Sequence, residues 1–97
     1  MCRVVNRHKE HYDVYIGRGT KFGNPYKDMP RAEAIALFRV YFKEQIRNGS
    51  ITLSELRELH GLRLGCSCHP KPCHGDFIVS VVNKLCGVKV NNLDFLS

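Results

Sequence analysis

The residue types best suited to chemistry gather in one short segment, residues 66–76. It reads CSCHPKPCHGD and holds three cysteines and two histidines. Its two prolines exclude a helix within the segment, whereas the apolar run after Asp76 predicts that a helix follows. The free N–H groups and the positive dipole end of that helix would lie beside Cys73, His74 and Asp76. The segment therefore suits an anion or a thiolate.

One interpretation of this segment is a zinc site. Thiolates and imidazoles are the usual ligands of tetrahedral zinc. The ligand set would be Cys66, Cys68, Cys73 and either His69 or His74. The spacing differs from a zinc knuckle, because the first pair is Cys-x-Cys and no separate second pair follows. Zinc is the one cofactor that these residues suggest.

A second interpretation is catalytic, and a third is structural. In the catalytic one, Cys73 is a nucleophile whose pKa is lowered by the helix N-terminus and a neighbouring imidazolium. His74 and Asp76 would then position or transfer a proton.

In the structural interpretation, Cys66 and Cys68 pack as small apolar residues at the end of a strand. His74 would bond a loop carbonyl and Asp76 would cap the helix. The residues leave all three interpretations open.

A second cluster, residues 17–25, reads GRGTKFGNP. Glycines let a backbone approach a ligand closely, and basic side chains bind phosphate. The residues expected to bind a ligand are Gly17, Arg18, Gly19, Lys21 and Asn24. The pattern matches neither the Walker motif nor the dinucleotide fingerprint, so a plain turn is the alternative. Tyr15, Phe22 and Tyr26 could stack on a base, although scattered aromatic residues in a small domain more often belong to the core.

The elements that must position these clusters follow from periodicity. Short β-branched and aromatic runs predict strands at residues 2–6, 13–16 and 62–66, the first two either paired as a hairpin or apart. Spacings of three and four predict a helix over residues 30–48. That helix should bury Ile35, Phe38 and Phe42.

Two further helices complete the expected fold. A capping box formed by Thr52 and Glu55 predicts the start of a short helix. Another should follow Asp76 and stop at Gly87. Strands and helices in this order predict a compact α/β domain with helices covering a small sheet. Residues 1–97 form a single domain in this interpretation, because a chain of 97 residues has room for only one core.

Composition limits the partners. Fifteen Lys and Arg against nine Asp and Glu give a formal net charge of +6, which favours anionic partners such as nucleotides or nucleic acid, or serves only as a solubilising surface. No apolar run approaches the ~20 residues that cross a bilayer, so we expect no membrane partner. Five cysteines without a secretory leader indicate reduced thiols and a cytoplasmic location.

The two clusters together resemble a known family. The motifs are YIGRG from Tyr15, GNP from Gly23, CxC from Cys66 and PCHGD from Pro72. In this order they are similar to a small domain family of unassigned activity in phage and bacterial genomes. Ser67 departs from the family pattern, in which an aromatic residue is expected between the two cysteines.

The Cys-His step is also similar to that of another α/β family, which places Cys-His-Arg between a strand and a helix. That similarity implies a small Rossmann-like sheet covered by helices. Both clusters would then lie at strand ends and form one site.

The resemblance and the residues lead to two hypotheses. In the first, the chain is a phage-type accessory protein of the host cytoplasm. It binds a nucleotide or nucleic-acid phosphate between the glycine-arginine loop and the cysteine segment, either for binding alone or as an enzyme acting on a nucleotide or base. In the second, it is a non-enzymatic module that binds nucleic acid or a host protein, and the cysteine segment is structural.

Overall fold

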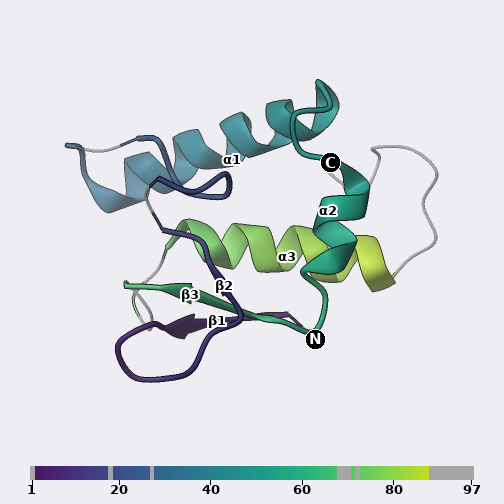
Figure 1. Ribbon diagram of the computed structural model, residues 1–97. Helices are drawn as coiled ribbons and strands as arrows, with labels where there is room; N and C mark the ends of the chain where they lie inside the picture. The colour runs from purple at the N-terminus through teal and green to yellow at the C-terminus, as the bar shows by residue number, and fades with distance from the viewer. Residues whose placement is uncertain (1, 18, 27, 68–70, 72, 88–97) are drawn as a thin grey trace.

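The computed structural model describes residues 2–17, 19–26, 28–67, 71 and 73–87 (Figure 1). In chain order the elements are β1 (Arg3–Asn6), β2 (Val14–Tyr15), α1 (Arg31–Arg47), α2 (Leu53–Glu58), β3 (Arg63–Cys66) and α3 (His74–Gly87). The predicted α/β class is confirmed, and each strand lies within its predicted range. Over the described part of the chain, no helix combines the length and the apolar character needed to span a membrane.

The strands form a parallel sheet in the order β1-β3-β2. The first two strands are therefore not a hairpin, because β3 lies between them. Leu64 at the centre is in register with Val4 on one side and Val14 on the other. Since all three strands run the same way, their carboxyl ends share one edge, where open α/β sheets bind their ligands.

The helices form the core on one side of the sheet. Figure 1 shows α3 between α1 and the strands, and α3 contacts β1, α1 and α2. The buried side chains of α1 recur every fourth residue, which is the stripe expected of a helix with one buried face. They are Ala34, Phe38, Phe42 and Ile46. Ile35 was predicted to be buried and is only half-buried, so the buried stripe is narrower than expected.

The start of α3 differs from expectation by three residues. The helix begins at His74, which places Asp76 in its first turn rather than before it. The Asp76 carboxylate accepts a hydrogen bond from the backbone N–H of Cys73 at 3.2 Å, and so still satisfies a free donor at the helix end. Gly75 lies against the sheet, and a Cβ atom added there would be 2.7 Å from Cδ1 of Ile16. A side chain at this position would require Ile16, which is fully buried, or α3 itself to shift.

Candidate functional site

A cavity of about 260 Å³ opens at the carboxyl edge of the sheet. We call it the strand-end cavity. It is lined by Tyr15, Gly17, Asn24, Tyr26, Arg31, Ile35, Cys66, Ser67, Cys73 and His74. The ends of β2 and β3, the loop after β2, and the first turns of α1 and α3 all contribute. Members of both sequence clusters therefore meet around one space.

His74 connects three of these elements. The side chain is buried, and its Nε2 donates a hydrogen bond to the carbonyl of Ile16 at 2.7 Å. Its ring meets that of Phe38 edge to face, with centroids 5.0 Å apart. Burial lowers the pKa of His74 below its ordinary value, and hydrogen bonding to backbone carbonyls opposes that shift only in part. His74 is therefore a neutral imidazole that fixes the start of α3 against the end of β2.

Cys66 and Cys73 form a buried thiol pair. Their sulfur atoms are 3.3 Å apart and share a hydrogen bond. This contact and burial raise the pKa of Cys73 well above its ordinary value, because both disfavour a thiolate. The backbone N–H of Gly75 opposes the shift but does not overcome it. Cys73 thus lines the cavity as a protonated thiol, whereas the catalytic interpretation requires a lowered pKa.

The loop after β2 is shaped by close backbone contacts. The backbone N–H and the hydroxyl of Thr20 both donate to the carbonyl of Gly17, at 3.3 and 2.7 Å. A side chain on Gly23 would collide with that same carbonyl. Asn24 then joins the loop to α1, because its side-chain amide donates to the carbonyl of Ala34 at 3.2 Å. Its oxygen accepts from the N–H of Tyr26 at 2.9 Å, so Asn24 positions the cavity wall.

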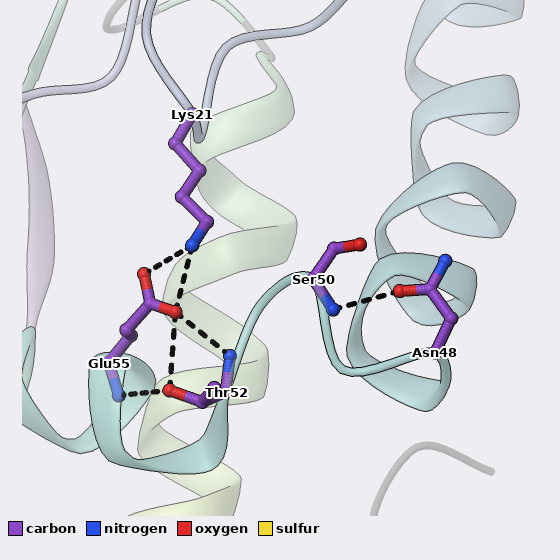
Figure 2. Close-up of polar contacts among 5 residues, drawn as sticks. All are labelled: Lys21, Asn48, Ser50, Thr52 and Glu55. Atoms are coloured by element: carbon purple, nitrogen blue, oxygen red, sulfur yellow. Dashed lines mark hydrogen bonds and ion pairs between the residues drawn. The ribbon is translucent and has the colours of Figure 1, made fainter.

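The other predicted site residues are placed differently. Lys21 does not line the cavity and instead pairs with Glu55 of α2, as Figure 2 shows, with Nζ 2.7 Å from one carboxylate oxygen. The structure also confirms the predicted capping box: the N–H of Thr52 donates to Oε1 of Glu55, and the N–H of Glu55 donates to the Thr52 hydroxyl. Gly19 has a φ of +86° and open space around it, as in an exposed turn. The expectations for Arg18, Cys68 and His69 lie outside the described residues.

The cavity also contains residues that the motifs did not reveal as ligand-binding. Arg31 is the first residue of α1, where a cation opposes the positive dipole end of the helix. The sequence shows this basic residue directly after Pro30, at the predicted start of the helix. An unfavourable charge at that position could have identified Arg31 as a candidate ligand-binding residue. Of the three aromatic residues considered above for base stacking, Tyr15 and Tyr26 are half-buried and line the cavity, whereas Phe22 packs against the core.

The predicted zinc ligands are brought together only in part. Cys66 and Cys73 are neighbours, but their 3.3 Å separation is shorter than the roughly 3.8 Å between sulfurs that bind one tetrahedral zinc at about 2.3 Å. Nε2 of His74 is turned to the carbonyl of Ile16. Across the described ranges, no three His, Cys, Asp or Glu side chains are grouped to hold a metal. The described residues therefore supply two sulfurs and no complete ligand set.

Comparisons with known proteins place the chain in a family. A family model described as "Domain of unknown function (DUF4326)" matches residues 3–84. The chain is also 52% identical over 87 residues to the "Uncharacterized 12.4 kDa protein in nrdA-td intergenic region" of Enterobacteria phage T4, covering 88% of this chain and 81% of that protein. No solved structure matches. The match spans both motif clusters and all six elements apart from the last residues of α3, and the chain therefore belongs to the DUF4326 domain family.

Proposed function

We propose that this protein binds the phosphate of a nucleotide or nucleic acid in the strand-end cavity. One observation carries the proposal: Arg31 and the first turn of α1, which has no side-chain cap, line the same space as the start of α3 at the carboxyl edge of a parallel sheet. Helix N-termini present free N–H groups and a partial positive charge, which favour an anion. A guanidinium adds a charge and a planar set of donors suited to phosphate.

The charges around the cavity support an anionic ligand. Arg31 is exposed and takes part in none of the ion pairs found within the described chain, which involve Arg3, Lys21 and Arg63. The first turn of α1 also holds Glu33, but that carboxylate is not part of the cavity wall. A bound phosphate would therefore neutralise a positive potential that the wall itself leaves uncompensated.

The size and the walls of the cavity fit a nucleotide better than a larger ligand. Its volume of about 260 Å³ is just below the usual range for small-molecule sites, roughly 300–1,000 Å³. Tyr15 and Tyr26 supply aromatic surface on which a base can stack. The guanidinium of Arg7 lies 5.0 Å from the centre of the Tyr15 ring, a contact that holds this ring at the cavity wall.

Catalysis at this site remains a prediction separate from binding. Cys73 and His74 line the cavity, but the thiol has a raised pKa and the imidazole is held by a backbone carbonyl. Asp76 does not line the strand-end cavity and is bonded to the N–H of Cys73. These contacts favour a positioning role for all three residues. Binding alone is therefore the function we propose, in a phage-type accessory protein of the host cytoplasm.

The test is titration calorimetry with adenosine 5′-monophosphate, adenosine and inorganic phosphate at one fixed salt concentration. The nucleotide should bind more tightly than adenosine, and Arg31→Ala should weaken its binding about tenfold or more, the effect expected of a lost charged hydrogen bond. Arg47→Ala is the matched control, because it removes the same charge from the far end of the same helix. Absence of nucleotide binding, or equal binding by wild type and Arg31→Ala, would overturn the proposal.

A further inference from the structure

A second cavity adjoins the first along the contact between α1 and α3. Its volume is about 190 Å³, and it is lined by Ile35, Arg39, Cys73, Asp76, Phe77 and Ser80. Ile35 and Cys73 line both cavities. The two spaces therefore lie side by side against these residues, at the contact between α1 and α3. We call the two spaces together the helix groove.

Basic side chains follow the same path along α1. Arg31 lines the first cavity, Arg39 lines the second, and Lys43 comes one turn later. Residues four apart are neighbours on the helix surface, so these three cations follow one slanted row, which turns about 120° around the helix between Arg31 and Lys43. No described ion pair uses any of them.

Phe77 of α3 contacts Arg39 and Lys43, the two cations at the far end of this row, beside the groove. The guanidinium of Arg39 lies 5.6 Å from the centre of the Phe77 ring, and Nζ of Lys43 lies 6.0 Å from it. Both distances fit cation–π contacts. The two cations are thereby kept at the helix–helix contact instead of extending freely into solvent, although each still has donors left for an anion.

The length of the row exceeds what one nucleotide can use. From Arg31 to Lys43 the helix advances about 18 Å at 1.5 Å per residue. A mononucleotide places its phosphate at one end of this distance, whereas a nucleic-acid strand repeats a phosphate along its whole length. Resting on the function proposed above, we infer that the helix groove binds single-stranded nucleic acid, with one nucleotide in the strand-end cavity and the following phosphates along Arg39 and Lys43.

A single strand fits these residues better than a duplex. A base that enters the cavity between Tyr15 and Tyr26 must be unstacked and unpaired, as in the recognition of single strands. Asp76, the carboxylate that lines the second cavity, is bonded to the N–H of Cys73. Its charge lies at the wall of the groove beside α3, so the phosphates should follow the α1 side.

The experiment compares ligands of different length by fluorescence anisotropy at several salt concentrations. The probes are single-stranded DNA and RNA of about 12 nucleotides, within the usual size of single-strand sites, with the matching duplex and adenosine 5′-monophosphate as competitors. The test variant is Arg39→Ala/Lys43→Ala. The control is Lys9→Ala/Arg57→Ala, which removes two charges from residues that line neither cavity.

We expect the single strand to bind at least about tenfold more tightly than the mononucleotide. Arg39→Ala/Lys43→Ala should lower strand affinity about tenfold and reduce the slope of log K against log salt by about 1.4, since each phosphate contact on a single strand contributes about 0.7. Mononucleotide affinity should not change in this variant, and the control should bind the strand like wild type.

Three results would overturn the inference. They are a strand that binds no more tightly than the mononucleotide, a duplex that binds as well as the single strand, and equal losses in the test and control variants. In each of these cases the function proposed above stands if the mononucleotide still depends on Arg31. Failure of the mononucleotide to bind contradicts the proposed function itself, so the two failures are distinguishable.

Discussion

His74 shows how one side chain can belong to a ligand site and still be structural. It lines the strand-end cavity, yet its position follows from the Ile16 carbonyl and the Phe38 ring. Loss of the imidazole would leave a buried acceptor unsatisfied, which costs about 1–3 kcal/mol. A residue that the catalytic interpretation expected to position or transfer a proton thus has a clear role in holding α3 on the sheet.

The lowered pKa of His74 predicts a pH dependence of stability. Because burial holds the folded-state pKa below the ordinary 6.5, the unfolded chain binds this proton more readily than the folded chain. The free energy of unfolding should therefore be fully maintained above about pH 6.5 and fall as the pH is lowered below that value. Urea unfolding of wild type and His74→Gln at several pH values measures the effect. The glutamine variant should lack this part of the decline, and an identical decline in both proteins would contradict the assignment.

The raised pKa of Cys73 predicts that the thiol pair is chemically protected. Cys66 and Cys73 are buried, whereas Cys86 is exposed. A cysteine is alkylated quickly only when it forms a thiolate and the reagent can reach that thiolate. Brief treatment of the native protein with iodoacetamide should therefore label Cys86 well before Cys66 or Cys73, and labelling in denaturant should remove the difference. Peptide mass mapping reads the order, and early labelling of Cys73 would instead support the catalytic interpretation.

At the scale of elements, the site depends on how closely α3 approaches the strands. Replacing Gly75 by Ala would put a Cβ atom 2.7 Å from Ile16 and 3.0 Å from Val4. Alanine normally favours a helix, so any loss of stability must come from this contact. We expect a cost of about 1–3 kcal/mol, as for overpacked cores. Chemical denaturation of Gly75→Ala should show it, while Ser80→Ala, on the exposed side of the same helix, should stay within about 0.5 kcal/mol of wild type.

Most of the elements could be predicted from the sequence, because they depend on local signals. The stripe ending in Phe42 and Ile46 and the capping box of Thr52 are both short-range patterns that the structure reproduces. The predicted start of α3 was wrong by three residues, because the Asp76 carboxylate lies in the first turn and accepts from the N–H of Cys73. The N–H of Asp76 also donates to the carbonyl of Cys73. Helix boundaries that depend on such hydrogen bonds are hard to predict from the sequence.

The arrangement of the site could be predicted only in outline. That both clusters follow strands was visible, and parallel pairing then brought Gly17 and Cys66 to one edge. The partner of Lys21 was not visible, since Glu55 lies 34 residues away in the sequence. This contact depends on how α2 packs near the loop after β2, and no local sequence pattern predicts that packing.

For the molecule as a whole, one aromatic side chain links the core to the site. Phe38 is fully buried and touches the rings of Phe42, Tyr41 and His74. Phe38→Ala should cost about 3–5 kcal/mol, a large part of the 5–15 kcal/mol typical of a domain. Urea titration followed by circular dichroism measures the loss. A variant that unfolds like wild type would mean that this face of α1 does not carry the core.

The last prediction concerns the coupling between the ligand and the global fold. The strand-end cavity is built from β2, β3 and the first turns of α1 and α3, so it exists only when the whole domain is folded. A ligand that binds only the folded state stabilises it by RT ln(1 + [L]/Kd), about 2.7 kcal/mol at a hundredfold excess over Kd. Thermal unfolding with increasing adenosine 5′-monophosphate should therefore show one transition whose midpoint rises steadily with concentration. Arg31→Ala should need more nucleotide for the same rise, while Arg47→Ala should follow wild type. A midpoint that does not move, or two transitions of which only one moves, would mean that the nucleotide does not bind a cavity shared by all of these elements.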